Sequence, residues 1–329
     1  MISLKSIARE LKVSPAVVSV AISGKAGTTG CSARTRQRIL QKVRQLGYRP
    51  HAAAAALASG RNHAIAVFIH TLGAEGSGLM ERFLDGLATA LNKQNQRLWL
   101  TFYQTDQEFL LRTRPGNLRD VDGLIVAGVL HKRLNAPLHR IEKTGIRVVT
   151  VMPSPVGRGI PNIYSDDEEQ TLLATNHLAA MGCRRIATLA TFASRLRGYQ
   201  KALASRGLPC RPELVFRTSS FHAKAGIQAV RHWLGRKRAF DGIVAQSDHQ
   251  AFGATQELIL RGIRVPGKVR VIGVDDSPLC WVSPVSLSSV SQEMEEIGKR
   301  AVEAVLDRIA GREILSVVVP PVLRLRESA

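Results

Sequence analysis

The sequence predicts a multidomain chain, in which a small all-α head containing a helix-turn-helix precedes a larger α/β part. Two short helical patterns separated by a tight break occupy residues 3–23. From residue 64 onward, short apolar runs of strand type alternate with amphipathic helical segments, as in folds built on parallel sheets covered by helices. A length of 329 residues exceeds the needs of one such head and allows two or three domains with sizeable cores.

The helix-turn-helix is predicted from apolar spacing and from cap residues. Apolar residues at positions 4, 7, 8 and 11 follow the spacing of a short helix with one buried face, and Ser3 precedes them as a cap. After a two-residue break, Ser14 and Pro15 begin a second helix, because proline needs no amide hydrogen at the first helical position. That helix is expected to run to about residue 23 and to stop at Gly24.

A third helix completes the head. Ser32 is its expected cap, Ile39, Val43 and Leu46 share one face of the run 34–46, and Gly47 ends it. Three short helices can bury one small common core. A generic three-helix bundle would do the same, so the charge of the segment decides between the two interpretations.

Residues 1–61 are strongly basic, and Glu10 is their only acidic residue. The basic residues are Lys5, Arg9, Lys12, Lys25, Arg34, Arg36, Arg38, Lys42, Arg44, Arg49 and Arg61. Together with a formal net charge of +20 for the whole chain, this imbalance indicates a polyanionic partner and favours double-stranded DNA. The same charge also predicts nonspecific DNA binding at low salt.

At this point the head resembles that of the LacI/GalR-family transcription regulators. The matching motifs are Ile7-Ala8, Val13-Ser14, Val18-Ser19, Ser32, Thr35-Arg36 and, most specific, Gly47-Tyr48-Arg49-Pro50-His51-Ala52-Ala53-Ala54. The resemblance implies a helix-turn-helix DNA-binding domain over residues 1–49, a hinge over 50–62, and a two-lobed, periplasmic-binding-protein-like domain over 63–329. The last of these would bind an effector and form the dimer.

The second helix is expected to enter the major groove. With Val18, Ala21 and Ile22 turned inward, its outward face is small and apolar. Base preference would therefore depend on thymine methyl groups and on DNA deformability rather than on guanine. The residues expected to contact DNA are Ser3, Ser14, Pro15, Ala16, Val17, Ser19, Val20, Ser23, Ser32, Tyr48, His51, Ala54 and Leu57.

The hinge contains an alanine-rich stretch that is too short to be stable as an isolated helix. We expect this segment to be disordered in isolation and helical when contacts hold it in place. In the family this segment folds as two chains meet over the operator centre, and the resemblance assigns Leu57 to the apolar wedge that enters the minor groove. A plain alanine linker is the alternative.

The α/β part also resembles the family, with a ligand cleft between two lobes at the carboxyl ends of strands. The most specific motifs are Asn176-His177-Leu178, Arg195-Leu196-Arg197-Gly198-Tyr199, Gly262-Ile263-Arg264-Val265-Pro266 and Val271-Ile272-Gly273-Val274-Asp275-Asp276. One lobe is expected near residues 62–160 and 292–318, and the other near 161–291 and the tail.

By this resemblance, Arg195 and Asp275 bind the effector, since a guanidinium and a carboxylate together suit neighbouring hydroxyl groups. A structural arginine–aspartate pair across the cleft is the alternative. Phe221 matches an aromatic residue that covers a sugar face, although a core phenylalanine fits nearly as well. Ser247 and Gln292 match positions that hydrogen-bond ligand.

Three positions depart from the family pattern. Met152 stands where the family often has aspartate or asparagine, Ser247 stands where it usually has asparagine, and Gly76-Ser77-Gly78-Leu79 replaces an Asn-Pro-aromatic loop. The first lobe's half of a typical sugar pocket is therefore poorly preserved. Two interpretations remain, an unusual ligand or none.

The resemblance implies a sequence-specific transcription regulator of the repressor type, which binds a pseudo-palindromic operator as a homodimer and responds to a small effector, expected to be a sugar or a sugar derivative. A ligand-independent architectural DNA-binding protein is the alternative. Catalysis is not expected, because Asp248-His249, the acidic run 166–169 and Ser283 accompany no nucleophile motif or metal-ligand spacing. The acidic run is interpreted as favourable charge at a helix start.

No cofactor, metal or membrane partner is expected. Cys31, Cys183, Cys210 and Cys280 are scattered without a CxxC pair, which indicates neither a disulfide framework nor a zinc site. No apolar run approaches the ~20 residues that span a bilayer. These features favour a cytoplasmic protein associated with the nucleoid.

Overall fold

The computed structural model describes residues 3–23, 31–48, 61–70, 75–114, 116–128, 132–157 and 159–329. The chain divides into two compact units, residues 1–62 and 63–329. Most of the predicted hinge, including His51, Ala54 and Leu57, lies outside the described residues.

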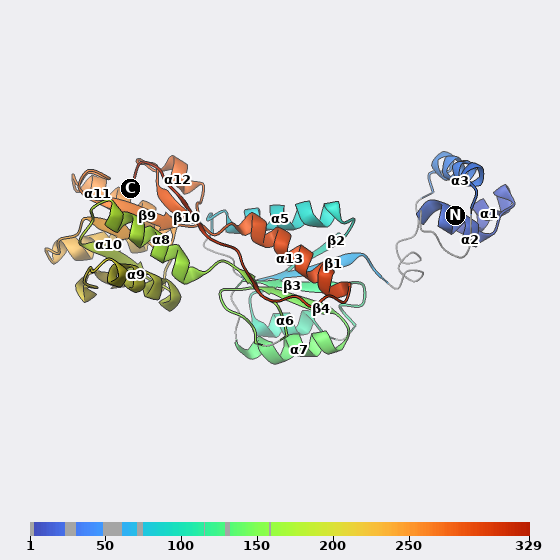
Figure 1. Cartoon of the computed structure of the whole chain (residues 1–329), viewed down its shortest axis with the longest axis horizontal. Helices are drawn as coiled ribbons and strands as arrows, with labels where there is room; N and C mark the ends of the chain where they lie inside the picture. The colour runs from blue at the N-terminus through green and yellow to red at the C-terminus, as the bar shows by residue number, and fades with distance from the viewer. Residues whose placement is uncertain are drawn as a thin grey trace. The chain divides into compact units, whose positions relative to one another are not determined.

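The described part of the first unit is all-α, as predicted. Its helices are α1 (Leu4–Leu11), α2 (Pro15–Ser23) and α3 (Ala33–Gln45) (Figure 1). The side-chain oxygens of Ser3 and Ser32 accept hydrogen bonds from the backbone N–H groups of Ser6 and Thr35, which caps α1 and α3. The helices share one buried core made by Ile7, Ala8, Val18, Ala21 and Ile39.

In the second unit, a parallel sheet of order β2-β1-β3-β4 forms the centre of lobe 1. Its strands are β1 (Ala64–Ile69), β2 (Arg97–Phe102), β3 (Gly123–Ala127) and β4 (Arg147–Val151). Its helices are α5 (Leu79–Lys93), α6 (Asp106–Arg112), the 3-10 turn η1 (Lys132–Leu134), α7 (Asn135–Lys143) and α13 (Met294–Ile309). Helices α5 and α13 cover one face of the sheet, and α6 and α7 cover the other (Figure 1).

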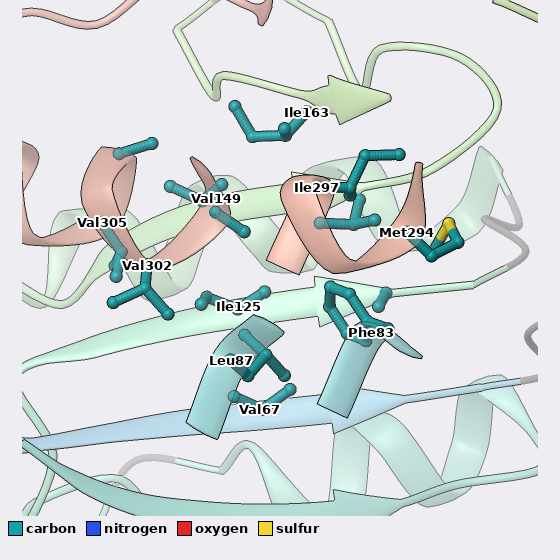
Figure 2. Packing of buried hydrophobic residues seen from close by; sticks show 14 of the residues in the cluster. Val67, Phe83, Leu87, Ile125, Val149, Ile163, Met294, Ile297, Val302 and Val305 are labelled. Carbon is teal, nitrogen blue, oxygen red and sulfur yellow. The ribbon is translucent and has the colours of Figure 1, made fainter. Parts of the chain in front are cut away.

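Both faces of the lobe 1 sheet are therefore buried, and β1 is buried along its whole length. Figure 2 shows the core beneath α5 and α13, where Phe83 and Leu87 pack with Val67, Ile125 and Val302. Residues from the end of the chain thus complete a core that begins at β1. The sequence predicts this return of the chain to lobe 1.

Lobe 2 is built on a sheet of order β12-β10-β9-β8-β6-β7. Its strands are β6 (Ile186–Ala190), β7 (Val215–Arg217), β8 (Gly242–Val244), β9 (Arg270–Val274), β10 (Ser288–Ser291) and β12 (Val322–Arg324). Its helices are α8 (Asp167–Ala180), α9 (Ala193–Ser205), the 3-10 turn η2 (Pro212–Leu214), α10 (Ala223–Gly235), α11 (Asp248–Leu260) and α12 (Leu279–Val282). Strand β12 pairs antiparallel with β10, so the otherwise parallel sheet carries one antiparallel strand at this edge.

Two close helix pairs cover the two faces of the lobe 2 sheet, α8 with α9 and α10 with α11. Glycine permits the closest approach in the second pair. A Cβ atom built on Gly226 of α10 would lie 2.0 Å from the carbonyl oxygen of Gln250 in α11. The separation of these helices is therefore set by the absence of a side chain at residue 226.

The chain passes between the lobes through a short parallel pair, β5 (Ile163–Tyr164) and β11 (Val317–Val318). Asn162, just before β5, fixes the end of β4. Its Oδ1 accepts hydrogen bonds from the Thr150 hydroxyl at 2.9 Å and the Met152 N–H at 3.1 Å, and its Nδ2 donates to the Met152 carbonyl at 2.9 Å. This crossing places Met152 and β5 at the junction of the lobes. Within the described ranges, no helix combines the length and apolarity that a membrane span needs.

Candidate functional site

A pocket with a volume of about 180 Å³ lies between lobe 1 and lobe 2. Lobe 2 contributes the loops that follow β6, β7, β9 and β10, which meet at the carboxyl ends of parallel strands, together with the first turn of α8. Lobe 1 and the crossing segment contribute the ends of β4, β5, α5 and α13. The lining residues are Leu79, Gly128, Val151, Met152, Pro153, Ile163, Tyr164, Ser165, Asp167, Phe192, Arg195, Phe221, Asp275, Gln292, Met294 and Ile297.

Arg195 is the buried cation of the pocket, with a relative exposure of only 5%. Its Nε donates to Oδ1 of Asp167 at 2.9 Å, and its Nη1 donates to the carbonyl of Gln246. Its guanidinium carbon lies 5.7 Å from the ring centre of Phe192 and 6.0 Å from that of Phe221. These contacts fix the guanidinium in one orientation at the pocket wall.

Asp167 is the counter-ion of Arg195, and sequence analysis did not identify it as a site residue. Its second carboxylate oxygen accepts a hydrogen bond from the Ser194 hydroxyl at 2.9 Å. The neighbouring Asp166 is the actual N-cap of α8, because its side chain accepts from the Glu168 N–H at 2.8 Å. The acidic run therefore places favourable charge at a helix start, as predicted, and also supplies the helix cap and one carboxylate that faces the pocket.

Asp275 follows β9 in a strained backbone conformation, with φ at 115°, and its side chain is buried. Gln292 Nε2 donates to its Oδ1 at 2.7 Å. Burial raises the pKa of Asp275 to about 8, and the nearby charge of Asp248 acts in the same direction. At neutral pH most Asp275 carboxyls are therefore protonated and offer one O–H donor.

Asp248 supports the strand ends behind Asp275. Its Oδ1 accepts from the Ser289 hydroxyl at 2.6 Å, and its Oδ2 accepts from the Ser277 N–H at 2.6 Å and from the Cys280 thiol at 3.2 Å. Burial raises the pKa of this carboxyl above its ordinary value. The fully satisfied carboxylate connects α11 with the loop after β9 and with β10.

The structure brings four of the five predicted effector residues to this pocket: Arg195, Phe221, Asp275 and Gln292. Arg195 forms its ion pair with Asp167, however, and not with Asp275, its partner in the alternative interpretation. Phe221 packs edge to face on Phe192, with ring centres 4.9 Å apart. These four predicted residues thus lie together at the pocket. The ion pair of Arg195 with Asp167 was not indicated by the sequence.

Ser247 does not line the pocket, and its prediction as a ligand contact is wrong in this structure. Its side chain caps α11 by accepting from the Gln250 N–H at 3.1 Å, and its hydroxyl donates to the Phe221 carbonyl at 2.7 Å. The hydroxyl is therefore fully used within the protein. Ser247 positions the Phe221 loop instead of facing a ligand.

Sequence analysis also missed Ser165 and Phe192. The hydroxyl oxygen of Ser165 is buried and has no hydrogen-bond partner among the described residues. A buried hydroxyl without a partner costs free energy unless a ligand or water pairs with it. Phe192 is placed by Gln246, whose Oε1 accepts from the N–H groups of Thr191 and Phe192 at 2.9 and 2.8 Å.

The head carries the second candidate surface. Ser14, Pro15 and Ala16 are exposed at the start of α2, whereas Ser19 and Val20 are half-buried. Ser3 and Ser32 are exposed caps, as described above, and the side-chain placement of Ser23 lies outside what the structure describes. These residues remain predicted DNA contacts.

Two predicted DNA contacts of the head are partly used by its own core. Val17 and Tyr48 are half-buried and pack against the cluster formed by α1, α2 and α3. The expectation that Val17 faces outward is therefore wrong in part, because α2 is short and apolar and buries more of its surface than one stripe. Only the exposed remainder of each side chain can contact DNA.

The basic charge of the head is largely available to a partner. Its one acidic residue, Glu10, forms an ion pair with Lys42 of α3. The other basic side chains that the structure describes in the head are exposed: Lys5, Arg9, Lys12, Arg34, Arg36, Arg38 and Arg44. The described head thus presents a cationic surface, as phosphate binding requires.

Comparisons with known proteins cover both units of the chain. The family described as a periplasmic-binding-protein-like domain matches residues 175–329. The HTH-type transcriptional regulator GntR of Pseudomonas aeruginosa is 29% identical over 322 residues, which cover 95% of this chain and 90% of the relative. The transcriptional regulator CelR in complex with cellobiose matches with a TM-score of 0.68 and 26% identity over 100% of both chains.

The Lac repressor bound to ONPG in its repressed state matches with a TM-score of 0.81 and 20% identity, over 100% of this chain and 99% of that one. The chain resembles LacI/GalR-family regulators in sequence and has the fold of the Lac repressor. The LacI/GalR resemblance covers the head, the crossing segments and both lobes.

Within the described residues, no group of His, Cys, Asp and Glu side chains is arranged to hold a metal ion.

Proposed function

We propose that this chain is a transcription regulator of the repressor type, which binds operator DNA through its helical head and is controlled by a small ligand in the pocket between the lobes. The observation that carries the proposal is the presence, in one chain, of a basic helix-turn-helix and a buried polar group at the strand ends of a two-lobed domain. Residues 1–49 would form the DNA-binding domain, 50–62 the hinge, and 63–329 the effector-binding and dimerisation domain.

The ligand class follows from the polar end of the pocket. Arg195, Asp275 and Gln292 provide donors and an acceptor in a fixed arrangement, and two phenylalanine rings lie beside the guanidinium. Such a group suits the hydroxyls and the apolar face of a carbohydrate or a sugar derivative. The similar regulator CelR is named in complex with a sugar, cellobiose, which supports this class.

Control would operate through the lobes. A ligand that contacts both walls binds one lobe arrangement more tightly than another, so it shifts the balance between them by its differential affinity, typically ~1 to 3 kcal/mol. The lobe arrangement would in turn decide whether two hinge segments can pair over the operator. A homodimer would present two heads to half-sites about one helical turn apart, roughly 10 bp between centres.

The chain would act in the cytoplasm, at the nucleoid, and we assign it no catalytic role. The relatives found are named as transcription regulators, not as enzymes. Both carboxylate oxygens of Asp248 accept hydrogen bonds from within the protein. Turnover of a sugar or phosphate ester by the purified chain would contradict this assignment.

The test is to retain a random DNA pool on the full-length protein at near-physiological salt and to sequence what remains bound. We expect a pseudo-palindrome with a flexible central step. Leu57→Ala should then weaken binding and bending of that sequence while leaving the fold intact, as circular dichroism would show.

A second function, sequence-independent coating of DNA, is favoured by the net charge of +20. It predicts no enriched motif and binding that falls steeply as salt rises. This outcome would replace the regulator with an architectural protein. A palindrome that survives at physiological salt would exclude coating as the main role.

A further inference from the structure

The two walls of the pocket differ in chemistry. On the lobe 1 side and on β5, the buried lining side chains that the structure describes are hydrocarbon or thioether groups: Leu79, Val151, Met152, Ile163, Met294 and Ile297. On the lobe 2 side, Asp167, Arg195, Asp275 and Gln292 form a hydrogen-bonding group. A ligand that spans the pocket therefore meets a polar surface at one end and an apolar surface at the other.

The apolar wall is the open end of the lobe 1 core. Figure 2 shows Met294 and Ile297 on α13 and Ile163 on β5, in the same cluster as Phe83 and Ile125. Met152 belongs to the cluster on the opposite face of the sheet, and only 2% of its surface is exposed. None of these side chains can pair with a ligand hydroxyl, so a hydroxyl placed against this wall would lose its hydrogen bonds to water.

The polar wall carries no uncompensated charge among the described lining residues. The cation of Arg195 is paired with the carboxylate of Asp167, and Asp275, whose pKa burial raises to about 8, is mostly uncharged at neutral pH and accepts from Gln292. An anionic ligand such as a phosphate or a carboxylate would find no free cation there. The unpartnered hydroxyl of Ser165, 7% exposed at the junction of the two walls, is instead suited to a neutral donor or acceptor.

We propose that the effector is a neutral amphipathic molecule, in which a hydroxyl-bearing ring binds the lobe 2 wall through Arg195, Asp275 and Gln292 and an alkyl or aryl substituent packs on the lobe 1 wall around Met152, Met294 and Ile297. This inference rests on the proposed function and names the substrate class of the same site. It also assigns a role to the buried thioether of Met152 in the pocket lining. The site is matched to a substituted glycoside rather than to a free sugar.

The experiment is isothermal titration calorimetry of the full-length chain with methyl, propyl and phenyl glycosides of a panel of hexoses and pentoses, each beside its parent sugar. Each buried methylene is worth roughly fourfold in affinity, so the propyl or phenyl compound should bind at least ~10-fold more tightly than the parent sugar. Equal affinity for the parent sugar and its substituted forms would overturn the inference.

Variants separate the two walls. Met152→Asn places an amide in the apolar wall and should remove most of the ~10-fold preference for the substituted glycoside over its parent sugar. Met294→Gln should do the same from α13. Met181→Asn, at a methionine with 46% of its surface exposed outside the pocket, is the matched control and should change neither affinity. A preference that persists in both pocket variants would contradict the assignment of the substituent to this wall.

Failure of this inference and failure of the proposed function give different results. If the DNA pool yields a palindrome but no substituted glycoside binds, the regulator stands and the ligand class is wrong. If a substituted glycoside binds with the expected preference but no palindrome is enriched, the pocket inference stands and the operator-binding function fails.

Discussion

The guanidinium of Arg195 and the carboxylate of Asp167 form a buried ion pair at 2.9 Å, with 6% and 10% of their side-chain surfaces exposed. The pair joins the first turns of α9 and α8 at the polar wall of the pocket. Because Arg195 also donates to the Gln246 carbonyl, its orientation is fixed before any ligand arrives. The pocket therefore presents a preorganised donor, at the cost of keeping two charges out of water.

Asp167→Asn should destabilise the second unit, since it leaves the Arg195 charge buried without a counter-ion. Loss of one partner of a buried pair typically costs about 3 to 5 kcal/mol. Urea unfolding followed by circular dichroism measures this loss. Glu295→Gln removes one partner of the exposed Lys299–Glu295 pair and should cost less than about 0.5 kcal/mol; equal losses in both variants would show that burial does not determine the cost.

Asp275→Asn should change how stability depends on pH. Burial raises the pKa of Asp275 to about 8, so between about pH 4 and pH 8 the folded chain keeps a proton that the unfolded chain releases. The contribution of this group to stability is thus complete at low pH and is lost as the pH rises through that window. The variant has no such proton, and its unfolding free energy relative to that of the native chain should increase with pH by up to about 1.4 kcal/mol per unit.

Chemical unfolding of both proteins at several pH values between 4 and 9 tests the Asp275 prediction. Above pH 8 the difference between them should become constant. A difference that does not vary with pH would mean that Asp275 is ionised throughout the window.

Gly226→Ala should be strongly destabilising, because the added Cβ would lie 2.0 Å from the Gln250 carbonyl and would force α10 and α11 apart. Overpacking of this kind costs typically about 1 to 3 kcal/mol, and a backbone neighbour cannot move aside cheaply. Gly235→Ala is the control on the same helix, since nothing lies within 4 Å of a Cβ built there. It should be neutral or stabilising by up to about 1 kcal/mol; thermal unfolding of both variants decides, and a stabilised Gly226→Ala would refute the close approach.

Val20→Arg should alter the operator that the head selects. The native second helix offers no side chain for bidentate guanine contacts, and Val20 is only half-buried, so a longer side chain can extend from this position. We expect selected half-sites of the variant to gain a guanine, whereas Val20→Ala should gain none. Sequencing of the retained pools measures this; an unchanged motif with a steeper salt dependence would place the new arginine on phosphate instead.

Much of the fold is readable from local pattern. The cap residues Ser3 and Ser32 and the apolar run of β1 predict their elements closely, because capping and strand burial depend on neighbours in sequence. Strand β10 is different: three of its four residues are buried serines, and two of them, Ser288 and Ser289, bond to Ser328 and Asp248, which are distant in the chain. No hydrophobic signal marks such a strand.

The candidate site was predictable where the resemblance supplied positions, as for Arg195 and Asp275. The pairing of Arg195 with Asp167 was not predictable. In sequence, the acidic run that contains Asp167 has the pattern of favourable charge at a helix start, and nothing in that pattern singles out one carboxylate as the partner of Arg195. Ser247 shows the opposite error. A serine before a helix can cap it or face a ligand, and only the placement of the Phe221 carbonyl, 26 residues earlier in the chain, decides for the cap.

Neither lobe is continuous in sequence, and this determines when each can fold during synthesis. Lobe 1 lacks Ile297, Val302 and Val305 until α13 has been made, and lobe 2 lacks β12 and Ser328 until the last residues emerge. The helices of the head, in contrast, are complete by residue 48. A growing polypeptide therefore completes its DNA-binding helices long before its ligand pocket. A chain whose synthesis stops early would keep the helical head without the pocket.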